Sequence, residues 1–499
     1  MARIAVVGAG LGAMAAAARL AVAGHEVTVY ERTETHGGGV RRFARDGFAF
    51  DTGPGLLRLP AAHRDLFVKT GREPLERCVE LTRIDPDVRH HFADGTTMTL
   101  PSTSHGGVAA ALDAALGEDA GARWNALLGR ARTVWEATRR PLLEEPLSHG
   151  ADAAGELGHD PYPRPVRRRR LALRRPGRAT RTGRPTTLRE VAEAELRDPR
   201  LVALLESYAH AYGLDPARAP AGAVVLPYME QTFGCWYPRG GTRALADAVY
   251  ARCRARGVRF RFGAGVRRVR AEGGRATGVE LADGSTEAAD VVVACGGVPG
   301  TDTWDGSGDG GGGSGDGAAA GEPPTGSARF TVLLALRGAR PRDAAHRAVV
   351  HTTVRGEEGV VTVLRPDDPA LRPDDGHEAA VLTTAVPGGP VAAPERLADE
   401  LVAAADAAGL GLGARVLWRE VRTPEAYAAE TGSPGGVVPA PVLAGADGAY
   451  LRAPNRTPLD GLYVAGGWAH PGGGLAHATM SGALVAGLVV EGDGWRGSR

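Results

Sequence analysis

The segment that most constrains this chain is the glycine-rich turn at residues 6–13, Val-Val-Gly-Ala-Gly-Leu-Gly-Ala. It places Gly8, Gly10 and Ala13 at the GxGxxG/A spacing, after a predicted strand and at the start of a predicted helix. Bare backbone at the two glycines lets a pyrophosphate approach the helix N-terminus, where free N–H groups favour negative charge. Glu31 ends the next predicted strand, where its carboxylate can accept hydrogen bonds from ribose hydroxyls. The segment therefore predicts a dinucleotide-binding β-α-β unit, because a generic glycine-rich turn would leave Glu31 unexplained.

The composition is typical of a soluble globular protein. The 499 residues are 43% hydrophobic and 23% charged with a net charge of +1, which favours two domains and predicts no nucleic-acid partner. Cysteines are scattered without ligand spacing, so we expect no disulfide framework, no metal site and a cytoplasmic location. Glycines interrupt the apolar stretch 4–23, and no other stretch reaches the roughly 18 apolar residues that span a bilayer. We therefore predict neither a signal peptide nor a membrane-spanning helix.

The order of predicted elements indicates two interleaved domains. Strand, turn, helix and strand alternate over the first 60 residues, which is typical of a parallel sheet. Helix-like patterns follow to about Trp236, and strand-like segments such as the one from Phe330 follow a glycine-rich stretch that cannot bury a core. We predict a nucleotide-binding domain formed by residues 1–100, 237–300 and 437–499. A second domain is predicted at residues 101–236 and 328–436, and a linker at residues 301–327.

Five blocks of the chain resemble the phytoene desaturase-like FAD oxidoreductases of the amine oxidase superfamily. They are Gly8–Glu31, Gly37–Pro54, Trp236–Val249, Arg422–Gly436 and Leu462–Gly482. In the last block, His-Pro-Gly-Gly-Gly after Leu-Tyr-Val-Ala-Gly is more similar to bacterial carotenoid desaturases than to amine oxidases. The resemblance implies an α/β fold with a Rossmann-like FAD-binding domain of the glutathione-reductase type. This domain would be assembled from discontinuous segments, with an inserted α+β substrate domain.

The resemblance also implies which residues bind FAD. The residues at the pyrophosphate and the adenosine would be Gly8, Gly10, Gly12, Ala13, Glu31, Arg32 and Val266, the last through its backbone. Those near the flavin ring, ribityl chain and pyrimidine edge would be Gly53, Pro54, Gly466, Gly467 and the turn Pro471–Leu475, including Gly473, Gly474 and Leu475. The family's usual Gly-Gly-Arg falls on Gly37, Gly38 and Gly39, so the arginine is missing and Arg41 or Arg42 is expected to replace it.

Two histidines lie in the C-terminal block. His470 is the catalytic candidate, as a proton donor close to the flavin, and the alternative is that it orients the loop through hydrogen bonds. His477 falls inside the following helix pattern and is predicted to be a packing residue.

A basic run, Arg164–Arg184, carries ten arginines around Leu-Ala-Leu. One interpretation is peripheral contact with anionic membrane lipid, which suits an enzyme that takes an apolar substrate from a bilayer. The other is a solvated loop in an arginine-rich chain. The sequence gives no basis for predicting the oligomeric state.

The leading functional prediction is an FAD-dependent oxidoreductase that desaturates, or isomerises by redox chemistry, an apolar isoprenoid-like or polyene substrate. The runner-up is a flavin amine oxidase or protoporphyrinogen-oxidase-like enzyme. Many amine oxidases that resemble this fold place a lysine near the flavin, whereas Lys69, the only lysine, lies early in this chain. A third alternative is a flavin-free escort protein on the same fold, against which the complete phosphate turn and Glu31 argue.

Overall fold

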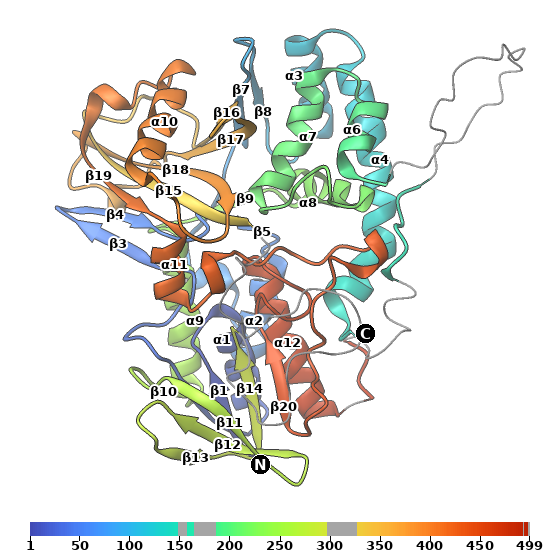
Figure 1. Cartoon of the computed structure of the whole chain (residues 1–499), viewed down its shortest axis with the longest axis vertical. Helices are drawn as coiled ribbons and strands as arrows, with labels where there is room; N and C mark the ends of the chain where they lie inside the picture. Colours follow the sequence, from blue (N-terminus) through green and yellow to red (C-terminus); the bar gives the residue numbers. More distant parts are fainter. Residues whose placement is uncertain (148–156, 164–185, 297–326, 493, 498–499) are drawn as a thin grey trace, which may run out of the picture.

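A computed structural model describes residues 1–147, 157–163, 186–296, 327–492 and 494–497. The predicted basic run and nearly all of the predicted linker lie outside these residues. Figure 1 shows a parallel sheet with its helices in the lower half of the molecule and a larger sheet beside a helical layer in the upper half. No helix in the described part of the chain combines the length and apolar character needed to cross a membrane.

The lower half is built on a five-stranded parallel sheet in the order β10–β2–β1–β14–β20. The strands are β1 (Arg3–Val7), β2 (Glu26–Tyr30), β10 (Arg259–Arg261), β14 (Val291–Cys295) and β20 (Leu462–Ala465). Strand β1 is buried on both faces, as expected for a central parallel strand. Ile4 and Val6 face the helices, whereas Ala5 and Val7 face a three-stranded meander. The predicted strands at the N-terminus are confirmed.

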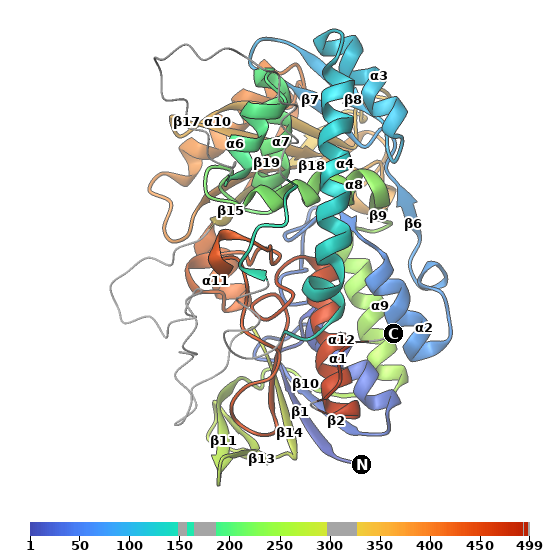
Figure 2. The same cartoon turned by 90° about the vertical axis from the view of Figure 1, so that its right-hand side faces the viewer.

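Helices cover one face of this sheet and the meander covers the other (Figure 2). The elements are α1 (Leu11–Val22), α2 (Ala61–Gly71), α9 (Thr242–Ala255), α12 (Leu475–Glu491), and the meander β11 (Val266–Glu272), β12 (Arg275–Leu281), β13 (Thr286–Ala288). Helices α1 and α12 cross at short range, because a Cβ on Gly482 would overlap the carbonyl oxygen of Gly12. In the other direction, a Cβ on Gly12 would lie 2.7 Å from the carbonyl oxygen of Ala478. The small residues of both helices therefore fix how closely the two ends of the domain approach.

The upper half contains a seven-stranded mixed sheet in the order β19–β15–β18–β17–β16–β7–β8. The elements are β7 (Val88–His91), β8 (Thr97–Leu100), β15 (Ser327–Arg337), β16 (Arg347–Val354), β17 (Glu357–Leu364), β18 (His377–Pro387), β19 (Val416–Arg422) and the covering helix α10 (Pro394–Ala407). Phe330, Val332 and Leu334 of β15 face α10. Leu333 and Ala335 point to the opposite side of the sheet.

A helical layer lies beside this sheet and shares a core with it. It comprises α3 (His105–Leu116), α4 (Ala120–Arg139), α6 (Leu188–Glu195), α7 (Pro199–Ala211) and α8 (Val225–Phe233). Trp124 of α4 is fully buried in that core. Side-chain caps from Ser104, Thr187 and Asp198 begin α3, α6 and α7. The helix-like patterns between residues 101 and 236 thus correspond to real helices.

Short strands join the two halves. They are β3 (Arg42–Arg45), β4 (Phe48–Asp51), β5 (Leu57–Arg58), β6 (Leu81–Arg83) and β9 (Cys235–Pro238). Helix α11 (Pro424–Thr431) packs near β15.

The predicted domain boundary at residue 100 is wrong. Strand β7 pairs in parallel with β16, and β8 pairs with β7. Met98 and Leu100 are buried in the core that contains α3 and α4. Residues 88–100 therefore belong to the upper sheet, because their pairing partner lies far along the chain and no local pattern marks it.

Candidate functional site

The glycine-rich turn lies at the carboxyl edge of the parallel sheet. Gly8 has φ +89°, a conformation that favours glycine, and its N–H donates to the carbonyl of Tyr30 at 2.8 Å. Gly10 is the N-cap of α1 and provides no side-chain cap. A Cβ on Gly10 would find Gly38 Cα at 3.9 Å as its nearest described neighbour, so the space beside it is open. The first turn of α1 can therefore present its N–H groups to an anion there.

Glu31 lies beside this turn at the end of β2 and is 7% exposed. Its Oε2 accepts a hydrogen bond from Ala9 N at 2.8 Å, and its Oε1 accepts from Thr33 N at 2.9 Å and Thr33 Oγ1 at 2.8 Å. Each oxygen of a carboxylate can accept more than one bond, so the fixed group can still receive ribose hydroxyls. Arg32 is exposed and turns toward α11, where its Nη2 donates to Ala429 O at 2.7 Å. Val266 begins β11 just after Gly265, which adjoins Arg32.

The second glycine cluster packs onto the first. Gly37 N donates to Ala9 O at 2.8 Å, and a Cβ on Gly38 would lie 3.0 Å from Gly10 Cα. A Cβ on Gly39 would lie 2.7 Å from the Tyr427 hydroxyl. These glycines allow two backbone segments to touch at the nucleotide site.

Two arginines were candidates for the missing family arginine, and they lie in different places. Arg41 donates to Gly38 O at 2.9 Å, Thr33 Oγ1 at 3.1 Å and Glu430 O at 2.9 Å. Arg42 donates to the carbonyl of Gly240, away from the glycine turns. The geometry favours Arg41, because only Arg41 shares Thr33 with Glu31.

Gly53 and Pro54 lie at the edge of a large cavity. A Cβ on Gly53 would overlap the carbonyl oxygen of Gly39, so this glycine is required by the protein backbone itself. The preceding Asp51 was not predicted as a site residue. Its carboxylate accepts from Thr242 N at 2.6 Å and Arg243 N at 3.2 Å at the start of α9, and burial raises its pKa to about 6. Asp51 lies in one block of the resemblance and Thr242 in another, which was the available sequence signal; their pairing appears only in the folded chain.

The glycines of the C-terminal turn have two different kinds of surroundings. Gly466 has φ +93°, and among the described residues a Cβ there would meet Cys295 Cβ alone, at 4.0 Å. A Cβ on Gly467 would lie 2.7 Å from Pro439 Cγ, and one on Gly473 would overlap Pro439 O. Gly467 and Gly473 thus make room for the neighbouring protein segment. Gly474, the N-cap of α12, is exposed, and Leu475 behind it is buried.

Asn455 and Ser481 hold this turn in place, and neither was predicted. Asn455 Nδ2 donates to Val464 O at 3.1 Å and His470 O at 2.7 Å. Ser481 Oγ donates to His470 O at 2.7 Å and accepts from Gly466 N at 3.0 Å. Both side chains are fully buried, so the turn following β20 is rigidly connected to α12.

The proton-donor role predicted for His470 is not supported by its surroundings. The ring is fully buried, and its Nε2 donates to the backbone carbonyl of Glu145 at 3.0 Å. Burial lowers the pKa of His470 to about 4, so the ring is neutral near pH 7. Its place agrees with the alternative prediction, that it orients the loop. Burial also lowers the pKa of His477 to about 4, and His477 packs near Trp135.

A central cavity, lined in part by Gly53 and Pro54, lies between the upper sheet and helices α7 and α8. Side chains from three neighbouring strands line one wall: Val349 of β16, Val360 and Leu364 of β17, and Val381 of β18. Phe50 and Leu56 line it nearer to Gly53. Tyr208 and His210 of α7 and Tyr237 of β9 contribute to the other wall. An elongated apolar molecule could lie along this strand wall.

An ion-pair network lies beside the cavity. It consists of Arg58, Asp87, Glu230 and Arg347. Arg347 Nη2 lies 3.0 Å from Asp87 Oδ2 and also bonds Glu230, which in turn bonds Arg58. Burial alone would raise the pKa of Glu230, but the two arginines hold it at about 2; burial raises the pKa of Asp87 to about 6.

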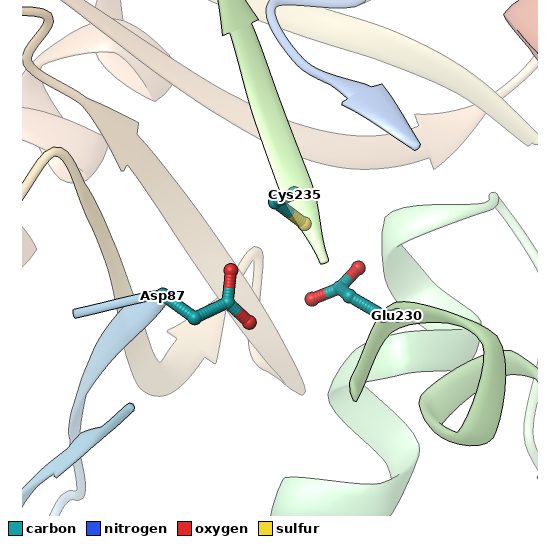
Figure 3. A group of neighbouring side chains, drawn as sticks. All are labelled: Asp87, Glu230 and Cys235. Atoms are coloured by element: carbon teal, nitrogen blue, oxygen red, sulfur yellow. The ribbon is translucent and has the colours of Figure 1, made fainter. Parts of the chain in front are cut away.

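Figure 3 shows that Asp87, Glu230 and Cys235 converge. Burial raises the pKa of the Cys235 thiol, so the thiol is neutral. Because Arg347 and Arg58 already bond the carboxylates, we interpret the group as an ion-pair network and assign no metal to it.

The family model described as flavin containing amine oxidoreductase matches residues 13–299. The chain belongs to this family. The match to a family of flavin containing oxidoreductases implies a flavin cofactor. The predicted family and fold class are both confirmed.

Two relatives within this family are carotenoid desaturases. The hydroxyneurosporene desaturase of Cereibacter sphaeroides is 30% identical over 516 aligned residues, covering 98% of this chain and 97% of that protein. The zeta-carotene-forming phytoene desaturase of Myxococcus xanthus is 32% identical over 304 residues, 60% of this chain. That match spans about half, 54%, of the Myxococcus protein. Among solved structures, an oxidoreductase from Methanosarcina mazei has a TM-score of 0.63 at 18% identity, with 97% of this chain and 99% of that chain covered, and supports the fold.

Proposed function

We propose that this protein is an FAD-dependent oxidoreductase that desaturates an apolar isoprenoid or polyene-like substrate at a CH–CH bond, or isomerises it by redox chemistry. The observation that carries the proposal is the central cavity, which is lined by Gly53, Pro54 and the apolar strand wall. The names of the two desaturase relatives support the same reaction class. The choice of FAD rests on Glu31 and the turn Gly8–Ala13, which provide places for an adenosine ribose and a pyrophosphate.

When bound, flavin would supply the oxidising power as acceptor of a hydride from the substrate, with the proton from the neighbouring carbon passing to water. The protein positions the substrate and excludes water. Val360, Leu364 and Val381 provide a surface that favours an apolar chain and disfavours water at the reacting bond. Asp51 fixes the Gly53–Pro54 segment by capping α9, and Thr242 Oγ1 donates to Pro54 O at 2.7 Å. The edge of the cavity nearest the flavin site is therefore held by backbone and side-chain bonds together.

The amine oxidase alternative is less well supported by the site. Lys69, the only lysine of the chain, is exposed on α2 and does not line the central cavity. An escort protein without flavin would have no need of the open space beside Gly10 or of the fixed Glu31 carboxylate.

Anaerobic reduction of the flavin tests the proposal. Purified holoenzyme is mixed without oxygen with a panel of polyenes in liposomes, and the flavin absorbance is followed. We expect polyenes to bleach the flavin and primary amines to leave it oxidised. Bleaching by amines and not by polyenes would establish the amine oxidase alternative, and a colourless protein that cannot be reconstituted with FAD would establish the escort alternative.

A further inference from the structure

The central cavity carries charged side chains that a pure hydrocarbon would not use. Arg58, Arg329 and Arg347 line it, together with Glu230 and Asp51. Charges that lose contact with water are costly unless they have partners of opposite charge. The pairing of each charged group therefore indicates what a bound ligand must supply.

Four of these five groups are accounted for. Arg347 is shared by Asp87 and Glu230, and Arg58 bonds Glu230. The Asp51 carboxylate is occupied by two backbone amides at the start of α9. Two arginines thus face two carboxylates, Asp87 and Glu230, within the network.

Arg329 is the exception. It is partly buried at the start of β15, and its Nη2 donates to the carbonyl oxygen of Ala211 at 2.8 Å. Within the described ranges it forms no ion pair, and its Nε and Nη1 have no hydrogen-bond partner. Burial lowers the pKa of Arg329, and the charge of nearby Arg58 lowers it further. Within the described residues, Arg329 is therefore the one arginine lining the cavity that has no carboxylate partner.

Arg58 offers donors to the same space. Its Nε is used by Glu230, and its guanidinium lies 5.3 Å from the ring centre of Tyr212, which limits its movement. Its two Nη groups have no partner in the part of the chain that the structure describes. Tyr212, Arg58 and Arg329 line the same cavity.

We propose that Arg329, assisted by Arg58, binds a carboxylate carried by an otherwise apolar substrate. A carboxylate would balance the unpaired charge and match the planar fork of a guanidinium. This inference rests on the proposed function and narrows its substrate class from hydrocarbons to polyenes or isoprenoids that end in an acid. The Arg329 guanidinium could instead donate to an oxygen of the flavin ring. The test distinguishes a substrate carboxylate from this flavin oxygen.

The test compares two ligands that differ only at one end. Holoenzyme is titrated at pH 8 with all-trans-retinoic acid and with retinol, and binding is followed by tryptophan fluorescence and by the flavin spectrum. The variants are Arg329→Gln, Arg329→Lys and, as a matched control, Arg342→Gln, which removes the same charge at an exposed position of the same half of the molecule. Flavin content and circular dichroism establish that each variant is folded.

We expect the wild type and Arg342→Gln to bind retinoic acid at least about tenfold more tightly than retinol, the size of one charge-assisted contact. Arg329→Gln should bind the two ligands within about twofold of each other, and Arg329→Lys should recover part of the preference. Equal binding of the two ligands by the wild type, or an unchanged preference in Arg329→Gln, would overturn the inference.

The flavin potential is measured in the same variants without ligand. A shifted potential in Arg329→Gln with unchanged ligand preference would assign the arginine to the flavin and overturn a role toward substrate. If hydrocarbon polyenes bleach the flavin equally well in wild type and Arg329→Gln, the proposed function stands and the carboxylate inference fails. If no polyene of either kind bleaches it, the proposed function itself fails.

Discussion

The Glu31 carboxylate joins three parts of the predicted nucleotide site: the turn after β1, the end of β2 and the Thr33 hydroxyl that also meets Arg41. Its position could be predicted from sequence, because the turn, the helix and the acid all lie within one short β-α-β unit. Asp51, Asn455 and Ser481 could not be predicted in the same way. Their partners are backbone groups brought close only by the folded chain.

Replacing Glu31 by Gln should weaken FAD binding by about tenfold or more, since charge-assisted hydrogen bonds are worth roughly 1.5–3 kcal/mol. Fluorescence titration of the apoprotein with FAD measures the effect. Glu34→Gln is the control, because Glu34 is exposed in the same segment. Equal affinities in the two variants would show that Glu31 does not meet the cofactor.

Replacing His470 by Gln separates an orienting role from a catalytic one. The substitution removes the bond to Glu145 O from a fully buried site, so we expect the free energy of unfolding to fall by about 1–3 kcal/mol. The pH profile of flavin reduction should keep its shape, because the ring is neutral near pH 7. Stopped-flow reduction and urea unfolding give the two readouts. Loss of an acidic limb from the rate profile would restore the proton-donor role.

At the level of helices and strands, local patterns were sufficient where both partners lie close in sequence. The β1, α1 and β2 elements and the helix that contains His477 were predicted for that reason. Strands β7 and β8 were assigned to the other domain because their partner β16 lies far along the chain. The ion-pair network could not be predicted for the same reason, because its members lie far apart in the sequence. They come from β5, α8, β16 and the segment before β7.

The crossing of α1 and α12 gives a prediction at this level. Gly482→Ala should destabilise the protein by about 2 kcal/mol or more and weaken FAD binding, because the new methyl would overlap Gly12 O and displace α1. Thermal unfolding and FAD titration test both effects. Gly129→Ala in α4 is the matched control. A Cβ on Gly129 would have no described neighbour within 4 Å. The better helix propensity of alanine should therefore raise the free energy of unfolding of this variant by about 0.5–1 kcal/mol. A neutral or stabilising Gly482→Ala would contradict the close crossing.

For the whole molecule, buried histidines govern the response to acid. Burial lowers the pKa of His63, His346, His470 and His477 to about 4 and that of His351 to about 3. Because the unfolded chain takes up these protons near pH 6.5 and the folded protein does not, stability should fall as the pH drops from about 6.5 to 4. Asp51 and Asp87, whose pKa values burial raises to about 6, act in the opposite direction but are fewer.

His63 provides the test of this response. Each fully buried histidine can contribute up to about 1.4 kcal/mol per pH unit. In His63→Gln, the free energy of unfolding should therefore fall less steeply between pH 6.5 and 5.5, by the slope that corresponds to about one proton. This change in slope is expected whatever the effect of the substitution on stability at pH 7.5. Urea unfolding at several pH values measures the slope. The exposed His105→Gln should leave the slope unchanged, and an unchanged slope in His63→Gln would contradict the prediction.

The placement of β20 and α12 also bears on the order in which a ribosome would release the parts of the molecule. Strand β20 completes the edge of the parallel sheet beside β14, and α12 packs against α1, yet both are translated after the whole upper half. The helical layer and the larger sheet can therefore fold first, while α1 still lacks its partner. A nascent chain would therefore be unable to complete the packing of α1 and the parallel sheet until this late segment emerges.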